Sequence, residues 1–337
     1  MKTTSFVAAS TLALAAASPA FAQNNSTIDQ LGSGNNATVT QTSSGNTSDV
    51  DQLSDGNTAT VDQSGPTNSS TILQSSILPN TANVDQDGAN SFSDIEQING
   101  SDNSTADVFQ DAAADLNTAE IIQDDARFSD ADINQGGGAN NGAVISQGDE
   151  TLFGGTNTFG TQNGDADITQ TGSDNFALIS QIGLGSVAEV VQTSDASFAQ
   201  INQNANSGGS ANAFIQQVGA LDYAEINQNS DFSNAQTYQN ASAVGNSTII
   251  NQGSVFGSDG NFAESVQDGD GNTSEIDQAE NSIGGLNTAS VLQLADNNFS
   301  NVTQEGTGNT ATVDQLSNGN ASFVTQTGSG NTTIVTQ

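Results

Sequence analysis

The chain has 337 residues, 38 acidic side chains against two basic ones, no histidine, no cysteine and a formal net charge of −36. Such a surface repels nucleic acid and anionic lipid, and the absence of cysteine excludes disulfide bonds. Without histidine, cysteine or any lysine beyond Lys2, the usual nucleophile–base pairs of enzymes are missing. Paired carboxylates could still catalyse, but no pair stands apart from the repeating background. We therefore expect no enzyme, no cofactor and no catalytic, cofactor-binding or metal-binding residues.

Residues 1–22 have the features of a secretory signal peptide. Lys2 provides a positive start, residues 6–17 are mostly apolar, and Ala20-Phe21-Ala22 has the small-residue pattern of a cleavage site. The apolar stretch is too short to span a bilayer, and no other long apolar run follows. We expect a protein that is secreted and that does not insert into a membrane.

From Gln30 to Gln337, glutamine ends each of 26 similar units. Fifteen of the 25 intervals between these glutamines are 11 residues long, nine are 12 to 15, and one is 23. The long interval, between Gln147 and Gln170, indicates an insertion near residues 148–164 or a degenerate unit around Gln162. Repeats of this length are typical of stacked architectures, so residues 23–337 are predicted to form one repeat domain.

Within each unit the informative residues stand on alternate positions. Valine or isoleucine lies two residues before the glutamine in every unit except two, which carry Thr237 and Ser265. A small residue lies four before it, and asparagine is commonest six before it. Alternation places these side chains on one face of a strand, and the intervening Gly, Asn, Asp and Ser residues favour turns. An 11-residue helical repeat is excluded, because the recurring glycines would destabilise it.

The sequence thus predicts an all-β, cross-β-like solenoid of stacked strand–turn–strand rungs, with two strands in each of about 13 rungs. One aliphatic and one small side chain per strand should fill a thin interior. The predicted core includes Val39, Val50, Val61, Ile72, Ile179, Val190, Val302, Val313, Val324 and Val335.

Such a small apolar interior predicts a further source of stability in the recurring amides. Stacked in register, each carboxamide can bond to its copy one rung above and below, whereas an unpartnered buried amide costs about 1–3 kcal/mol. The predicted ladder residues are Gln30, Gln41, Gln52, Gln63, Gln181, Gln192, Gln304, Gln315, Gln326, Gln337, Asn35, Asn46, Asn57, Asn309, Asn320 and Asn331.

The segment from Gln30 to Gln41 has the form Q-x-G-x-x-N-x-A-x-x-x-Q, which recurs from Gln170 to Gln181 and from Gln304 to Gln315. This pattern resembles the repeat of curlins, the subunits of the curli amyloid fibres of bacterial biofilms. The resemblance implies an extracellular subunit that polymerises with itself on the bacterial surface and serves the biofilm matrix, adhesion and surface colonisation. It also implies a nucleating subunit, an outer-membrane export pore and accessory chaperones as partners.

Acidic residues at outward positions, such as Asp29, Asp49 and Asp132, are interpreted as gatekeepers that keep the chain soluble. We therefore expect salt, divalent cations or mild acid to speed polymerisation. Alternatives are a calcium-binding solenoid, although the calcium nonapeptide is absent, and an ice-binding solenoid, for which outward Thr38, Thr40 and Thr60 are suggestive. A minor or nucleating fibre subunit is a further alternative.

Two smaller features complete the prediction. Arg127 is expected to form a local ion pair with Asp124 and Asp125. Phe109, Phe214 and Phe323 are expected to point outward, where they could bind a partner or pack between filaments.

Overall fold

The computed structural model describes residues 23–76, 78–113, 115–148, 161–204, 210–229, 232–240, 244–254, 260–280 and 286–337. Every regular element in these segments is a β-strand, and they contain no helix that could cross a membrane. The predicted signal peptide and residues 149–160 of the predicted insertion lie outside the described residues.

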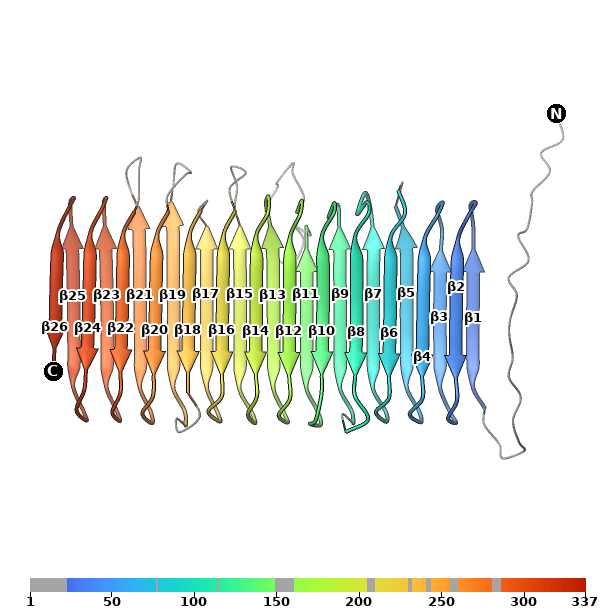
Figure 1. Ribbon diagram of the computed structural model, residues 1–337, viewed down its shortest axis with the longest axis horizontal. Helices are drawn as coiled ribbons and strands as arrows, with labels where there is room; N and C mark the ends of the chain where they lie inside the picture. The colour runs from blue at the N-terminus through green and yellow to red at the C-terminus, as the bar shows by residue number, and fades with distance from the viewer. Residues whose placement is uncertain are drawn as a thin grey trace.

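The 26 strands alternate between two parallel sheets of 13 strands each (Figure 1). We call them sheet A, with the odd-numbered strands, and sheet B, with the even-numbered strands. Sheet A contains β1 (Asn25–Gln30), β3 (Thr47–Gln52), β5 (Ser69–Ser75), β7 (Phe92–Ile98), β9 (Thr118–Asp124), β11 (Gly142–Gln147), β13 (Phe176–Ile182), β15 (Phe198–Asn204), β17 (Tyr223–Asn229), β19 (Ser247–Ser254), β21 (Thr273–Glu280), β23 (Phe299–Glu305) and β25 (Ala321–Thr327).

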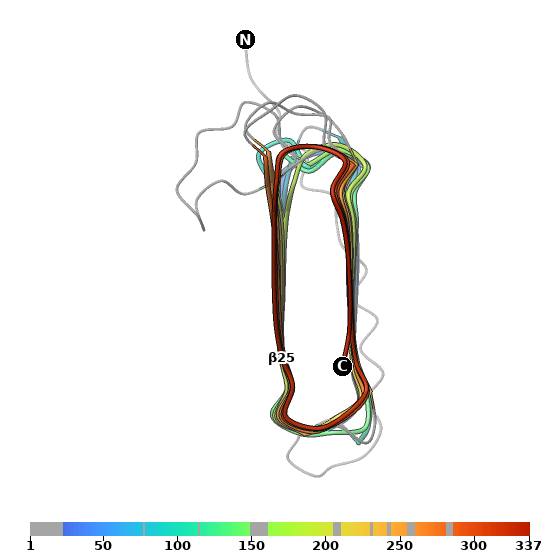
Figure 2. The ribbon, with the colours of Figure 1, turned by 90° about the vertical axis from the view of Figure 1, so that its left-hand side faces the viewer.

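Sheet B contains β2 (Asn36–Gln41), β4 (Thr58–Gln63), β6 (Thr81–Gln86), β8 (Thr105–Gln110), β10 (Asp130–Gln135), β12 (Asp165–Gln170), β14 (Val187–Gln192), β16 (Asn212–Gln217), β18 (Asn234–Gln239), β20 (Phe262–Gln267), β22 (Thr288–Gln293), β24 (Thr310–Gln315) and β26 (Thr332–Thr336). Seen along the column, each rung is a flattened loop with one strand from each sheet (Figure 2). The prediction of an all-β solenoid with 13 two-strand rungs is confirmed.

The strands stack in register, so that equivalent positions of the repeat lie beside one another. Between β1 and β3, for example, Ile28 pairs with Val50 and Gln30 with Gln52. The long interval does not disturb this register, because β10 pairs directly with β12, with Gln135 beside Gln170. Gln162 forms isolated bridges with Arg127 and Leu184 in the turns and does not join the stack of glutamines.

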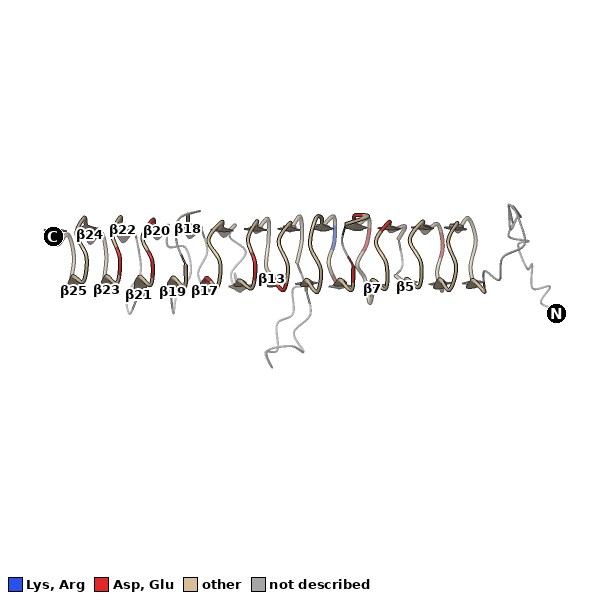
Figure 3. Ribbon diagram, turned by 90° about the horizontal axis from the view of Figure 1, so that it is seen from below, with Lys and Arg blue, Asp and Glu red and all other residues tan. Residues whose placement is uncertain are grey.

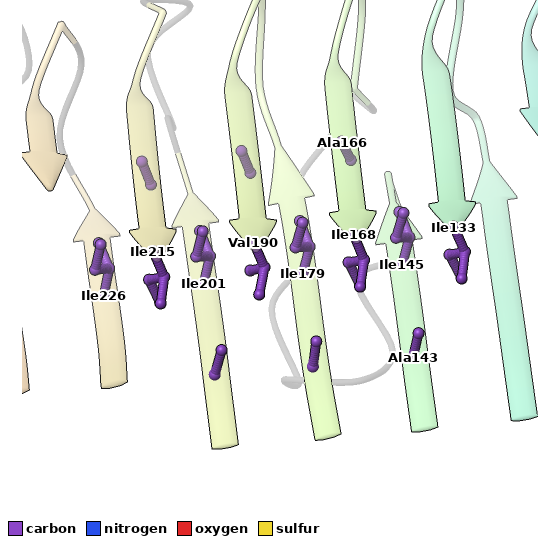
Figure 4. Close-up of a cluster of buried hydrophobic side chains, with 14 of the residues drawn as sticks. Ile133, Ala143, Ile145, Ala166, Ile168, Ile179, Val190, Ile201, Ile215 and Ile226 are labelled. Carbon is purple, nitrogen blue, oxygen red and sulfur yellow. The ribbon is translucent and has the colours of Figure 1, made fainter. Parts of the chain in front are cut away.

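The interior holds one branched aliphatic and one small residue per strand along most of the column (Figure 4). Of the predicted core residues, Val39 and Val335 are partly buried, because they lie in the first and last strands of sheet B. The others are buried: Val50, Val61, Ile72, Ile179, Val190, Val302, Val313 and Val324. Thr237 and Ser265, the two exceptions in the sequence pattern, are adjacent in sheet B and are also buried.

The small position differs between the sheets. In sheet B it is alanine from β2 to β24. In sheet A the middle strands from β9 to β17 carry alanine, whereas the strands on either side carry serine, with Thr248 in β19. The hydroxyls of six of these serines are buried and have no hydrogen-bond partner: Ser48, Ser70, Ser93, Ser274, Ser300 and Ser322.

The turns also follow a rule. The residue before the inward asparagine often has a positive φ, as at Gly34 (+75°) and Gly56 (+76°), and asparagine takes this role at Asn140 (+59°), which precedes Asn141. This conformation suits glycine and is tolerated by asparagine. Longer repeat units occur after seven sheet A strands but after only three sheet B strands. Insertions therefore gather mainly on one edge of the column.

Candidate functional site

Two unbroken ladders of glutamine side chains run through the described column, one along each sheet. In sheet A the ladder starts with a bond from Gln30 Nε2 to Gln52 Oε1 (2.6 Å) and ends with one from Gln304 to Gln326 (2.7 Å). In sheet B it runs from Gln41, which donates to Gln63 (2.8 Å), to Gln315, which donates to Gln337 (3.2 Å). Every strand of both sheets ends in a ladder glutamine or, for β26, is directly followed by one, Gln337.

Each interior glutamine also binds across the column. Gln52 Nε2 in sheet A donates to the carbonyl of Asn36 in sheet B (3.1 Å), and Gln63 Nε2 in sheet B donates to the carbonyl of Thr47 (3.1 Å). Gln181 and Gln192 repeat the pattern with the carbonyls of Asp165 (2.9 Å) and Phe176 (3.2 Å). One amide therefore joins successive rungs and the two sheets, although it is buried where water cannot replace these bonds.

The asparagines are stacked in a different way from the predicted amide-to-amide ladder. Asn35 Oδ1 accepts the backbone N–H of Asn57 (2.9 Å), and Asn309 Oδ1 accepts that of Asn331 (3.0 Å). Their Nδ2 groups mostly bind oxygens of the turns or of strand ends, as from Asn46 to the carbonyl of Gln63 at the end of β4 (3.2 Å) and from Asn320 to the Ser317 carbonyl in a turn (2.7 Å). A direct amide contact at the predicted positions is Asn331 Nδ2 to Asn309 Oδ1 (3.0 Å).

The difference follows from side-chain length and position. Asparagine is one methylene shorter than glutamine and lies where the turn enters the strand. Its oxygen therefore reaches the neighbouring backbone N–H, and its nitrogen reaches the turn. The glutamines thus bond to one another, and the asparagines tie the turns to the strands.

Outward carboxylates stack where the in-register pairing brings them together. Asp107, Asp132, Asp167 and Glu189 occupy one position on consecutive sheet B strands. Burial against the neighbouring strands, followed by repulsion from Asp130, Asp107, Asp167 and Asp165, raises the pKa of Asp132 to about 7. Burial and nearby carboxylates also raise the pKa of Asp167 to about 6. In sheet A, burial and then the charges of Glu96 and Glu120 raise the pKa of Asp94 to about 6.

These acidic groups do not form a cation site of the usual kind. Within the described segments, no group of three or more acidic residues is arranged to hold a metal ion. The outward threonines also fail to form a continuous face, because Thr38 and Thr60 are followed in sheet B by Asn83 and Asp107.

The ends of the column are nearly free of acidic residues. Residues 23–48 contain one, Asp29, and residues 315–337 contain none. The other 37 lie between Asp49 and Asp314, and acidic positions are visible along the middle of the column in Figure 3. Like charges therefore repel along the sides of the column far more than at its two end surfaces.

Arg127 lies in the turn before β10. Its guanidinium is 3.6 Å from Asp125 Oδ1, as predicted, and also 4.0 Å from Asp102 Oδ2 of the preceding rung, which the sequence did not indicate.

Phe109 is 36% exposed and Phe323 is 74% exposed, whereas Phe214 packs against Tyr238 with ring centroids 5.4 Å apart.

The fold and the ladders define a class of protein: a two-sheet parallel β-solenoid with stacked glutamines in its interior. The family model for the curlin associated repeat matches residues 161–193 and 306–337, which include β12 to β14 and β24 to β26. These two matches confirm the resemblance to the curlin repeat that was seen in the sequence. No curated protein matches the chain.

The repeat family and the fold are consistent with a subunit of a curli-like fibre, and they point to a structural, non-catalytic protein.

Proposed function

We propose that this chain is a structural subunit of extracellular curli-like amyloid fibres, which polymerises end to end by strand stacking. The observation that supports this most directly is the form of the two end surfaces. The first rung, β1 with β2, and the last rung, β25 with β26, each keep the repeat pattern and pair on one side only within the described column. A second copy can continue both sheets at either surface.

The distribution of charge favours addition at the ends over association at the sides. A fibre in which bodies met side by side would bring stacked carboxylates such as Asp132 and Asp167 of two copies together. End addition instead joins surfaces whose rungs carry one acidic residue or none. The acidic residues along the sides of the column then prevent lateral aggregation, while the end rungs remain able to pair with another copy.

The biological setting follows from the family and the predicted signal peptide. In this proposal the protein is exported through an outer-membrane pore, kept unfolded by accessory chaperones, and assembled on the bacterial surface from a nucleating subunit. The fibre then serves the biofilm matrix, adhesion and surface colonisation. The curlin repeat supports self-assembly; the other partners are part of the proposal.

The first test is polymerisation of purified residues 23–337, followed by an amyloid dye and by electron microscopy. We expect unbranched fibres and shorter lag times at higher ionic strength, because salt screens the carboxylates. Fibres from the protein alone would indicate a main subunit, and fibres only after adding seed would indicate a client of a nucleator. A chain that stays monomeric even with seed and high salt would contradict the proposal.

A matched pair of variants tests the role of the neutral ends. Thr325→Asp places a carboxylate on the last sheet A strand, and Thr169→Asp makes the same change on β12 in the middle. We expect Thr325→Asp to lengthen the lag several-fold at low salt, with recovery at high salt, and Thr169→Asp to change it little. Equal effects would show that the charge of the end rungs does not govern assembly.

A further inference from the structure

One acidic residue lies among the inward side chains where the turns enter the strands. Six residues before the ladder glutamines, the chain carries asparagine at 17 of 26 positions and serine, glycine or alanine at eight others. The remaining position is Asp222, directly before β17. Asp222 is 1% exposed, and no other acidic residue among those that the structure describes is buried as deeply.

One oxygen of Asp222 bonds as an asparagine oxygen does. Its Oδ1 accepts the backbone N–H of Asn246 in the next rung (2.9 Å). In the same way, Asn246 Oδ1 accepts the backbone N–H of Asn272 one rung further on (2.8 Å). The carboxyl group therefore takes the place of an amide in this column and continues it on the side of Oδ1.

The other oxygen, Oδ2, is buried and has no hydrogen-bond partner within the described part of the chain. In asparagine the equivalent atom is Nδ2, a donor, which bonds to a turn carbonyl, as from Asn272 to Gly269 (3.0 Å). The equivalent donor of the next rung, Asn246 Nδ2, is also unpartnered among the described residues and therefore does not bond to Asp222. Because an ionised carboxylate can only accept hydrogen bonds, an acceptor stands where the repeat provides a donor.

The charges around Asp222 also disfavour its ionised form. The acidic residues of the neighbouring turns are Asp195 before β15 and Asp268 and Asp270 before β21, and the one on strands β15 to β19 is Glu225, which points outward from β17. The sequence holds no lysine or arginine in residues 128–337, so no basic side chain compensates them. Burial, opposed by the N–H of Asn246 and reinforced by the charge of Asp270, raises the pKa of Asp222 to about 6.

We infer that Asp222 is a proton-binding site inside the column, which controls the strength of the joint between the rungs of β17 and β19. As a neutral carboxylic acid it gains an O–H donor for a turn carbonyl, while the other oxygen keeps the N–H of Asn246, so it bonds as asparagine does in other rungs. As a carboxylate it leaves a buried charge with one oxygen unpartnered, which weakens the joint. The inference concerns the folded column and holds whether or not copies polymerise.

The direction of the pKa shift sets the pH range of the effect. The pKa of Asp222 is about 6 in the folded chain and 3.8 for an ordinary aspartate, so between these values the folded chain binds more protons than the unfolded chain. The stability that this site supplies is therefore present in acid and is lost as pH rises through about 6. From about pH 5 to about pH 7, this group alone raises the unfolding equilibrium constant about tenfold.

The test compares urea denaturation of the unmodified chain and of Asp222→Asn at about pH 5 and at about pH 7.5. Asparagine carries the donor permanently, so we expect the variant to be more stable than the unmodified chain at the higher pH and to lack the tenfold change. Asp195→Asn is the matched control, because it makes the same substitution at an exposed residue in the turn before β15. It should keep the pH profile of the unmodified chain.

An Asp222→Asn profile as steep as that of the unmodified chain would overturn the inference. A variant that fails to fold, or that is less stable than the unmodified chain at the higher pH, would also overturn it, because the column would then require the carboxylate.

Asp222→Ser provides a second check. Serine occupies the equivalent position at Ser197, where its hydroxyl donates to the Gly219 carbonyl (3.2 Å). The serine variant should also lose the tenfold change, and its persistence would place the titrating group elsewhere and reject the inference. None of these measurements uses fibres, so their outcome is separate from that of the proposed function.

Discussion

The rungs at the two ends of the column and the rungs in its middle share one backbone plan but differ in composition. The end rungs follow the 11-residue unit, carry almost no charge, and place serine at the small position of sheet A. The middle rungs, from about β9 to β17, place alanine there and include the stacked carboxylates and the longest interval. Isoleucine also fills most of the aliphatic positions in this middle part.

The two compositions suit two different roles: the middle rungs stabilise the column, and the end rungs bind another copy. The middle has tightly packed alanine and isoleucine with no orphaned hydroxyl at the sheet A small position, so it is suited to holding the column together. The sheet A strands on either side of the middle keep buried serine hydroxyls without partners, which lowers their stability. The first and last rungs lack the charge that would repel another copy. We therefore expect perturbations of the middle to affect stability, and perturbations of the ends to affect assembly.

The largest expected effect comes from removing a central glutamine. Gln181 accepts from Gln147 (3.0 Å) and donates to Gln203 (2.9 Å) and to the Asp165 carbonyl (2.9 Å). Gln181→Leu leaves the buried Oε1 of Gln203 without its ladder donor and leaves Nε2 of Gln147 with only the Asp130 carbonyl as acceptor. At about 1–3 kcal/mol for each of these two disrupted amides, we expect a loss of roughly 2–6 kcal/mol in the free energy of unfolding. Urea denaturation of the monomer measures it.

The matched change at the end is Gln30→Leu. Gln30 is only partly buried and has one ladder bond, to Gln52. We expect a loss of about 1 kcal/mol or less. Equal losses at both positions would show that the ladder does not strengthen toward the middle of the column.

The next effect is a dependence of stability on pH in the middle rungs. The pKa of Asp132 is raised to about 7, above the usual 3.8 of an unfolded aspartate, so between these pH values the folded chain binds more protons than the unfolded one. The free energy of unfolding should therefore be highest in mild acid and should fall as pH rises through about 7. Asp132→Asn should raise stability at pH 8 and flatten the profile from pH 5 to 8.

The groups that face Asp132 are Asp130 on its own strand, Asp107 on β8, and Asp165 and Asp167 on β12. Asp314→Asn is the control, because Leu292 and Thr336 flank Asp314 and supply no charge. An Asp132→Asn profile as steep as that of the unmodified chain, measured by denaturation at each pH, would contradict the assignment.

The smallest expected effect concerns the interruption of the aliphatic column. Thr237 is fully buried and its hydroxyl has no partner, so the isosteric change Thr237→Val should stabilise the fold by about 1 kcal/mol. The neighbouring Ser265 behaves differently, because its Oγ lies 3.4 Å from Thr248 Oγ1 across the interior. Ser265→Val would crowd Thr248, and we expect it to destabilise. Thermal unfolding distinguishes the two, and a gain from both would refute this account of the packing.

The sequence predicted the strands, the inward face and the stacking of glutamine, because alternation at fixed distance from Gln30, Gln52 and their copies specifies both the face and the register. It did not predict how asparagine bonds. The two amides have the same chemistry, and only the position of Asn35 beside the Asn57 backbone decides that its oxygen binds N–H rather than a second amide.

The sequence also did not predict the stack of outward carboxylates. Asp132 and Asp167 are 35 residues apart and become neighbours only when the interval between Gln147 and Gln170 is known to add no rung. The contact of Arg127 with Asp102 likewise depends on how two turns of different length lie on consecutive rungs.

The alternation of the strands between two sheets constrains how such a chain can change its length. Duplicating or deleting two consecutive units adds or removes one whole turn of the coil, and every later strand returns to the sheet that it occupies now. Duplicating a single unit would move every later strand to the opposite sheet. From that point onward, the residues that occupy the small position of sheet A would lie in sheet B, and those of sheet B would lie in sheet A, which exchanges serine and alanine. Growth by gene duplication is therefore compatible with this architecture only in even steps.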